Sequence, residues 1–204
     1  MPYRPTRFND TVGIDLKWVK DSAGKRFHLL NILDLATSFN LGILLDDKSS
    51  KSVMEAFKVF WLSWAGPPGK AVADQGKESF GTFSELMRHL GTHFNLMALE
   101  APWQNGMVER HGGVLGDIIT ATVMETSPVG IDQMKDVCMH AAMAKNRRPG
   151  KGGFAQRILV FGVDERLIAS GLNHYLEEPD DAAITVANAN KTYPDSMAIR
   201  KAAI

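Results

Sequence analysis

The sequence of 204 residues has one cysteine, Cys138, and no long run of apolar residues. A single cysteine excludes an internal disulfide and the cysteine-rich zinc modules. No stretch approaches the roughly 18–20 apolar residues that span a bilayer, and residues 1–10 are polar. We therefore expect an intracellular protein with no membrane partner and no secretory signal.

Net charge is also absent, because 23 basic residues balance 23 acidic ones. The distribution is nevertheless uneven, since residues 163–204 carry four basic and seven acidic side chains. Residues 140–157 contain five basic side chains and no acidic one, namely Lys145, Arg147, Arg148, Lys151 and Arg157. A basic strip of this kind suits an anionic polymer such as nucleic acid, and it equally suits a solvated loop.

Hydrophobic periodicity predicts the elements of an ordinary globular domain, with 45% hydrophobic and 23% charged residues. Apolar and polar residues alternate over residues 11–19, and two further β-rich runs follow at 26–33 and 39–45. Their short connections favour an antiparallel meander.

The period then becomes helical over residues 49–64, where Ser52 and Glu55 have capping-box spacing. Five apolar residues share one helical face and are expected in the core: Val53, Phe57, Phe60, Trp61 and Trp64. For the aromatic residues of this face, a dimer contact is the alternative interpretation.

The remaining elements alternate in type along the chain. We expect strands at 70–73 and 93–99, helices at 82–90, 105–125 and 131–145, and a short apolar run at 158–162. Two later strands, each followed by a helix, are typical of the parallel part of a mixed α/β sheet. The sequence thus predicts a five-stranded mixed sheet, with strands 1–3 antiparallel and the later strands parallel, flanked by helices.

Three acidic residues stand out by their positions. Asp15 lies inside the first strand, Asp74 directly follows the strand at 70–73, and Glu109 lies in the first turns of the long helix. A carboxylate within a strand is costly unless it is solvated, paired or bound to a metal. A divalent cation relieves the repulsion of clustered carboxylates and suits phosphoryl transfer. For each acid taken alone, a turn cap, an edge charge or a helix N-terminal charge is the favoured interpretation.

Six short segments together resemble the integrase catalytic core of retroviruses and LTR retrotransposons. They are Gly13-Ile14-Asp15, Asp34–Thr37, Gly66–Pro68, Ala73-Asp74-Gln75-Gly76, residues 102–113 (PWQNGMVERHGG) and residues 158–162. The intervals of 59 residues from Asp15 to Asp74 and 35 from Asp74 to Glu109 also match that family within one residue. The resemblance covers roughly residues 8–163 and leaves 164–204 as an acidic C-terminal appendage.

The resemblance implies a ribonuclease-H-like fold and DNA 3′-end processing followed by strand transfer. Asp15, Asp74 and Glu109 match the catalytic triad, which holds two Mg²⁺ or Mn²⁺ ions per active site. Asn105 matches the amide that contacts DNA beside the site. The implied partners are element ends and target DNA in a homodimer or higher oligomer, in the nucleus of a eukaryotic host, with no small-molecule substrate.

Further DNA contacts are expected around the triad. Arg110 follows the catalytic glutamate, and Trp103, in the loop expected before the catalytic helix, can stack on a base or anchor that loop. The basic residues Lys145, Arg147, Arg148 and Lys151 are expected to bind phosphate. Asp34 is expected to shape a turn, and Cys138 to be a buried small hydrophobe.

Departures from the family pattern leave an alternative open. The loop after Asp74 is one residue longer than usual, and Gly112, Gly113 and Gly116 fall where that helix usually carries polar or basic residues. With 14 residues before Asp15, we expect a core without the family's zinc domain. The alternative is an inactive or domesticated core that binds nucleic acid or dimerises; a ribonuclease acting on RNA–DNA hybrids fits the 102–113 block less well.

Overall fold

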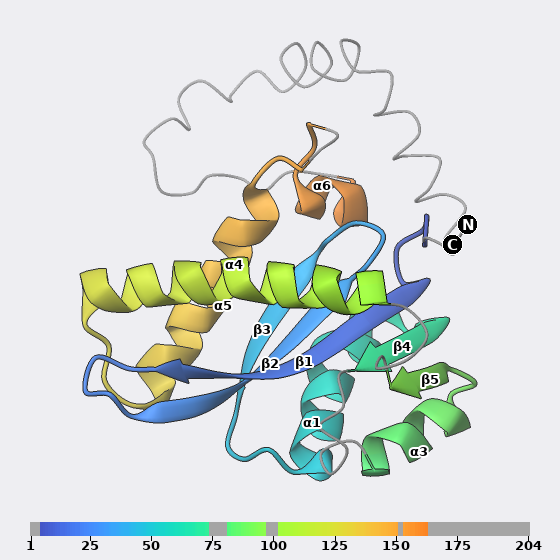
Figure 1. Cartoon of the computed structure of the whole chain (residues 1–204), viewed down its shortest axis with the longest axis horizontal. Helices are drawn as coiled ribbons and strands as arrows, with labels where there is room; N and C mark the ends of the chain where they lie inside the picture. The colour runs from blue at the N-terminus through green and yellow to red at the C-terminus, as the bar shows by residue number, and fades with distance from the viewer. Residues whose placement is uncertain (1–4, 74–80, 97–101, 151–152, 163–204) are drawn as a thin grey trace. The chain divides into compact units, whose positions relative to one another are not determined.

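The computed structural model describes residues 5–73, 81–96, 102–150 and 153–162. The chain falls into two compact units, residues 1–148 and 149–204. Figure 1 shows the elements of both units along the chain. The acidic appendage expected at 164–204 lies outside the described residues.

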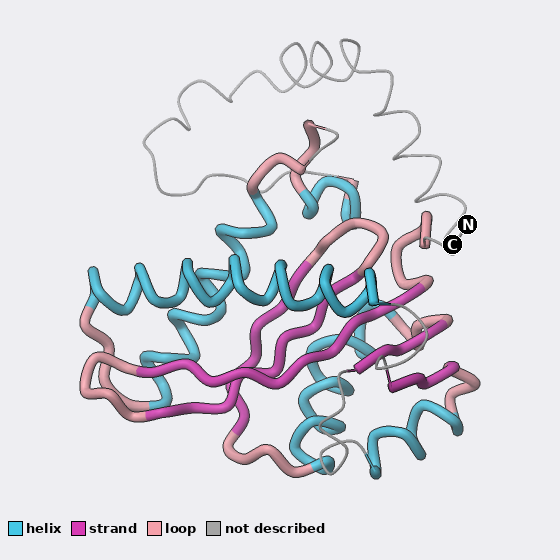
Figure 2. The backbone as a smooth tube through the Cα atoms, viewed as in Figure 1, coloured by secondary structure: helices cyan, strands magenta, loops and turns pink. Residues whose placement is uncertain are grey.

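The first unit is built on one five-stranded sheet, drawn as the central strands of Figures 1 and 2. Its strands are β1 (Thr11–Lys20), β2 (Arg26–Asp34), β3 (Asn40–Leu45), β4 (Lys70–Ala73) and β5 (His93–Leu96). The spatial order is β3-β2-β1-β4-β5. β1 pairs antiparallel with β2 and parallel with β4, which pairs parallel with β5. The mixed sheet predicted from hydrophobic periodicity is confirmed.

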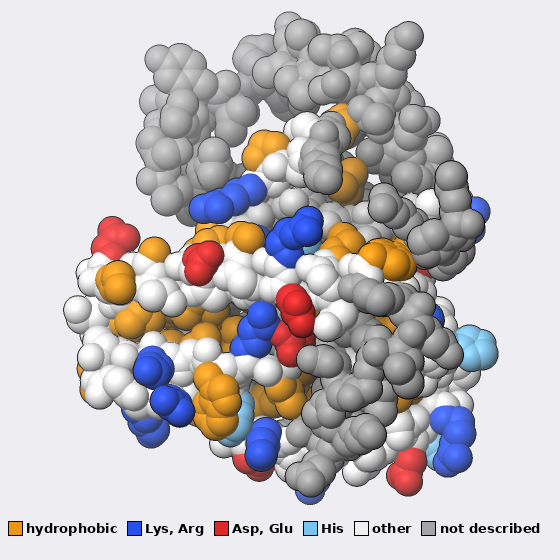
Figure 3. Space-filling view, viewed as in Figure 1, with side chains coloured by type: hydrophobic (Ala, Val, Ile, Leu, Met, Phe, Trp, Pro, Cys, Tyr) orange, Lys and Arg blue, Asp and Glu red, His pale blue; other side chains and the backbone are white. Residues whose placement is uncertain are grey.

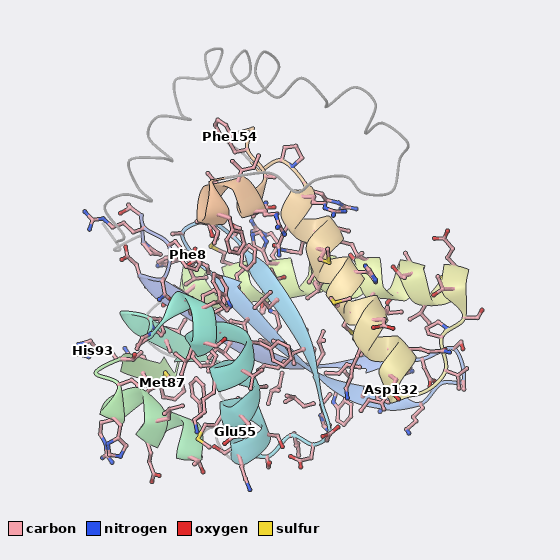
Figure 4. All side chains as sticks on the ribbon, turned by 180° about the vertical axis from the view of Figure 1, so that it is seen from behind. Phe8, Glu55, Met87, His93, Asp132 and Phe154 are labelled. Atoms are coloured by element: carbon pink, nitrogen blue, oxygen red, sulfur yellow. The ribbon has the colours of Figure 1, made fainter. Side chains whose placement is uncertain are left out.

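Helices cover both faces of this sheet (Figures 1 and 4). They are α1 (Ser50–Phe57), α2 (Ser63–Ala65), α3 (Gly81–His89), α4 (Pro102–Thr126) and α5 (Ile131–Arg147). α4 and α5 share a core with the sheet, in which Leu115 and Cys138 pack with Val19 and Leu44. The expected burial of Cys138 is confirmed. None of the described helices is both long enough and apolar enough to cross a bilayer.

The helix expected at 49–64 differs from the prediction in two ways. Its N-cap is Ser49, whose Oγ accepts a hydrogen bond from the Ser52 backbone N–H, so Ser52 is not the capping residue. A π-helical turn, η1 (Lys58–Leu62), then interrupts the α-helical phase. Phe57 and Trp61 are fully buried as predicted, whereas Phe60 is 48% and Trp64 41% exposed, although the sequence predicts both in the core.

Two further boundaries correct the sequence prediction. α4 begins at Pro102, which places Trp103 in its first turn and not in a preceding loop. Proline suits this position because the first helical N–H has no partner within the helix. In the second unit, the apolar run at 158–162 belongs to α6 (Gln156–Phe161), which ends at Gly162 in the left-handed conformation.

Candidate active site

Close packing of α4 on β1 brings the first and third predicted acids into one region. A Cβ atom at Gly13 would overlap the side chain of Val108, so β1 and α4 approach here only because residue 13 has no side chain. Asp15 lies two residues beyond Gly13 on the same face of β1, and Glu109 directly follows Val108. Residues of β1 and α4, which are far apart in the sequence, are therefore neighbours at the contact between Gly13 and Val108.

Lys17 links the two acidic residues. Its Nζ lies 3.4 Å from Asp15 Oδ2 and donates a hydrogen bond of 3.4 Å to the backbone carbonyl of Glu109. The Asp15 side chain is 16% exposed and that of Lys17 29% exposed. Acidic and basic side chains lie side by side just below α4 on the surface drawn in Figure 3. Asp15 and the backbone of Glu109 thus lie within reach of the same ammonium group.

The carboxylate of Glu109 is oriented by the preceding turn of its own helix. Asn105 Nδ2 donates a hydrogen bond of 2.9 Å to Glu109 Oε1. Residues four apart share a helical face, so this pair is local to α4. Trp103 is half-buried in the first turn, and Arg110 is exposed. Asn105 therefore acts on the position of Glu109 as well as lying beside it.

The second predicted acid, Asp74, lies outside the described residues. Its predecessor Ala73 pairs with Ile14 in the parallel β1–β4 register, and Ile14 is the residue before Asp15. Within the described ranges, no group of three or more His, Cys, Asp or Glu side chains is placed to hold a metal ion. The two described carboxylates, Asp15 and Glu109, are hard oxygen ligands of the kind that suits Mg²⁺ or Mn²⁺. They fit a divalent cation as part of its ligand set.

Part of the predicted basic strip is buried. Arg147 and Arg148 are exposed at the end of α5, whereas Lys145 is 3% exposed and its Nζ donates to the backbone carbonyl of Ser38. Burial, with a smaller contribution from the charge of Arg148, lowers the pKa of Lys145 to about 8. The helical phase of α5 turns residue 145 toward the sheet, so Lys145 is withdrawn from the expected surface strip. Lys151 lies outside the described residues.

His111, two residues after Glu109, is uncharged at neutral pH. Burial, followed by the positive charges of Lys145 and Arg110, lowers its pKa to about 4. It therefore adds no positive charge beside Glu109 under ordinary conditions.

Asp34 shapes the turn after β2, as the sequence suggested. Its fully buried carboxylate accepts hydrogen bonds from the backbone N–H of Asn9 at 2.9 Å and from the N–H and hydroxyl of Thr37, both at 2.7 Å. Burial raises its pKa, and these hydrogen bonds act in the opposite direction. The turn-shaping prediction is confirmed.

Sequence reasoning missed Lys17 and Asn31. Asn31 is directly opposite Asp15 in the β1–β2 register and is fully buried. Its Oδ1 accepts from Asn40, while its Nδ2 has no hydrogen-bond partner among the described residues. The two-residue period of a strand puts residues 15 and 17 on one face, and this signal identifies Lys17 as a neighbour of Asp15.

Comparison with known proteins agrees with this architecture at the level of fold. No protein-family model matches the sequence, and neither does any curated protein. Among solved structures, the HTLV-2 integrase catalytic core domain in complex with magnesium is similar in two forms. The trimeric form has a TM-score of 0.61 at 15% identity, over 75% of this chain and 97% of that chain. The dimeric form has a TM-score of 0.60 at 16% identity, over 74% and 94%.

A larger assembly contains the same fold. A chain of the simian T-cell lymphotropic virus intasome, in complex with the PP2A regulatory subunit B56 gamma, has a TM-score of 0.66 at 16% identity. The match covers 81% of this chain and 58% of that one. The described core therefore has the fold of retroviral integrase catalytic cores, which is ribonuclease-H-like, and the predicted resemblance to that family is confirmed at this level.

Proposed function

We propose that this protein is a metal-dependent polynucleotidyl transferase of the integrase type, which processes DNA 3′ ends and joins them to target DNA. The observation that carries the proposal is the meeting of Asp15 on β1 with the Glu109 backbone on α4, both within 3.4 Å of Lys17 Nζ. The integrase-core fold supports it. Asp15 directly follows Ile14, which pairs with Ala73 at the end of β4, and catalytic groups of open α/β sheets gather at strand ends.

Asp15, Asp74 and Glu109 would hold the divalent cations, as the family resemblance implies. Two bound Mg²⁺ or Mn²⁺ ions would supply Lewis acidity for attack of water or a 3′-hydroxyl on phosphorus. The chain contributes the positions of the ligands: Gly13 lets α4 approach β1, and Asn105 fixes the Glu109 carboxylate through its 2.9 Å hydrogen bond. Rigid placement of reacting groups accounts for a large part of such catalysis.

DNA would cross the same unit. Arg147 and Arg148 are exposed cations at the end of α5, and Arg110 is exposed one residue beyond Glu109. Asn105, one turn before Glu109, and Trp103, in the first turn of α4, would face the reacting strand. Lys151, which belongs to the second unit, is proposed as a further phosphate contact. We also infer that the protein works where host DNA is accessible, which is the nucleus in a eukaryote.

Self-association belongs to the proposal as well. Val59, Phe60 and Trp64 are large apolar side chains exposed in one short stretch of η1 and α2. Such side chains favour burial against a partner. The same feature supports the alternative function, in which an inactive core binds nucleic acid or dimerises.

The proposal is tested by nicking and strand joining on a DNA duplex, with Mg²⁺ or Mn²⁺ and with EDTA. The wild-type chain is compared with Asp74→Asn and Glu109→Gln, and with Glu125→Gln as a control, because Glu125 is exposed at the far end of the same helix. Metal-dependent products from the wild type and the control alone support the enzyme. No products from any of the four chains would favour the binding module.

A further inference from the structure

Lys17 occupies an unusual place for a positive charge. Its ammonium lies 3.4 Å from Asp15 Oδ2 and 3.4 Å from the backbone oxygen of Glu109. A divalent cation bound to Asp15 would lie about 2 Å from the same carboxylate. Two cations cannot hold these positions together without strong repulsion. Lys17 and a metal ion therefore compete for Asp15.

Gly112 makes the room that Lys17 occupies. A Cβ atom on Gly112 would stand 2.8 Å from both Cε and Nζ of Lys17 and 2.9 Å from Asn31 Nδ2. Gly113 and Gly116, on the same helix, have no neighbouring atom within 4 Å of such a Cβ. A glycine inside a helix destabilises the helix relative to alanine. Of these three glycines of α4, only Gly112 leaves space that another residue occupies: the absent side chain forms a notch that holds the Lys17 ammonium.

The notch at Gly112 is also bordered by a hydrogen-bond donor, the side-chain amide of Asn31. Asn31 is fully buried opposite Asp15, and its Nδ2 has no partner among the described residues. The Lys17 ammonium and the Asn31 amide nitrogen thus both lie next to Gly112, and the ammonium pairs with Asp15.

We propose that Lys17 is a built-in counter-ion of the acid site, held in the notch at Gly112 and displaced when a divalent cation binds Asp15. Lys17 is a positioning residue, since it acts through Asp15. Its partial exposure makes displacement inexpensive, because ion pairs near the surface contribute little to stability. The inference rests on the proposed function in one respect, that Asp15 is a metal ligand.

The first test measures metal binding without any reaction. Mn²⁺ binding to the full chain is followed by the electron paramagnetic resonance of free Mn²⁺, for the wild type and for Lys17→Met, which keeps the length and removes the charge. We expect the Kd of Lys17→Met to be lower by about tenfold, because a competing unit charge is gone. Lys20→Met, about 16 Å along β1 from Asp15, is the control and is expected to change the Kd by less than about twofold.

The second test uses the notch itself. Gly112→Ala should expel the ammonium and lower the Kd for Mn²⁺ severalfold, whereas Gly113→Ala adds a methyl group in open space and should leave the Kd unchanged. Gly112→Ala also presses on Asn31, so it is repeated in the Lys17→Met background. There the Kd is expected not to fall further, because no ammonium remains to be expelled. Circular dichroism melts confirm that each variant is folded.

The outcomes separate the inference from the function on which it rests. If Asp15→Asn abolishes Mn²⁺ binding while Lys17→Met leaves the Kd unchanged, Lys17 is no counter-ion and the proposed metal site stands. If Gly112→Ala lowers the Kd equally with and without Lys17, the notch does not act through the ammonium. If neither the wild type nor Lys17→Met binds Mn²⁺, both the inference and the proposed metal site are overturned.

Discussion

Gly13 of β1 lies so close to Val108 of α4 that a methyl group at residue 13 would overlap the valine side chain. Asp15 is two residues beyond this contact on one element, and Glu109 is one residue beyond it on the other. The contact between Gly13 and Val108 therefore determines how closely β1 and α4 approach each other beside the two acidic residues.

A larger side chain at residue 13 should weaken the packing of α4 on β1 beside Asp15 and Glu109. We expect Gly13→Ala to lower the free energy of unfolding by about 1–3 kcal/mol, because overpacking displaces α4 from β1. Gly113→Ala, which meets no atom within 4 Å, is the matched control and should stabilise α4 by up to about 1 kcal/mol. Urea denaturation measures both. Equal stability of Gly13→Ala and the wild type would mean that the contact is looser than described.

The turn after β2 should depend on Asp34. Asp34→Ala leaves the N–H groups of Asn9 and Thr37 without their acceptor in a buried place, so we expect a loss of about 2–4 kcal/mol of unfolding free energy. Asp136→Ala, at an exposed position of α5, should change stability by less than about 0.5 kcal/mol. Thermal and urea denaturation supply the comparison. A small effect at Asp34 would show that water replaces the carboxylate.

Burial of Lys145 predicts a dependence of stability on alkaline pH. In the folded chain its pKa is about 8, below the ordinary value of 10.5, so between these pH values the unfolded chain binds more protons than the folded one. The free energy of unfolding should therefore rise with pH over this window through Lys145. Urea denaturation at pH 8 and pH 10 should show this rise in the wild type, and a smaller rise or none in Lys145→Met.

The control for that experiment is Lys135→Met, on an exposed position of the same helix. It should keep the pH dependence of the wild type. If Lys145→Met retains the full rise as well, the amine of Lys145 is not held at a lowered pKa in the folded chain.

Arg147 and Arg148 should account for part of the salt dependence of DNA binding. Replacing both with glutamine should flatten the slope of log K against log salt by about two if each contacts one phosphate. Lys48 and Lys51, exposed at the start of α1, provide a control pair with the same loss of charge. Fluorescence anisotropy at several salt concentrations measures the slope. An unchanged slope in the Arg147 and Arg148 variant would place the DNA path elsewhere.

Local patterns in the sequence were sufficient for most of the sheet and helices. Alternation in 11–19 and the turn residues that follow predict β1 and β2, although the structure buries both faces of β1 over Thr11–Ile14 and of β2 over Leu29–Asp34. Helical periodicity predicts the buried side chains consistently only where the helix remains a regular α-helix. Phe60 and Trp64 are expected in the core but are partly exposed, whereas Trp61, in the same π-helical turn as Phe60, is fully buried.

The candidate site could be predicted in part. The family resemblance suggests Asp15, Asp74 and Glu109 as one site. Lys17 Nζ lies 3.4 Å from Asp15 and from the Glu109 backbone oxygen, Asp74 lies outside the described residues, and the catalytic role of the three stays a prediction. The burial of Lys145 was not predictable, since it depends on how α5 is rotated on the sheet. The notch at Gly112 depends equally on the approach of α4 to β1, which no local pattern contains.

The central claim is that Asp15 and Glu109 work as one catalytic unit. It is tested most directly by the rate of metal-dependent cleavage of a branched DNA substrate, measured for the wild type, Asp15→Asn, Glu109→Gln and the double variant. We predict that each single change slows cleavage by about 10²–10³-fold or more, and that the double variant is scarcely slower than either single one, because residues of one unit are not additive. Full activity in either single variant, or losses that multiply in the double variant, would contradict the account.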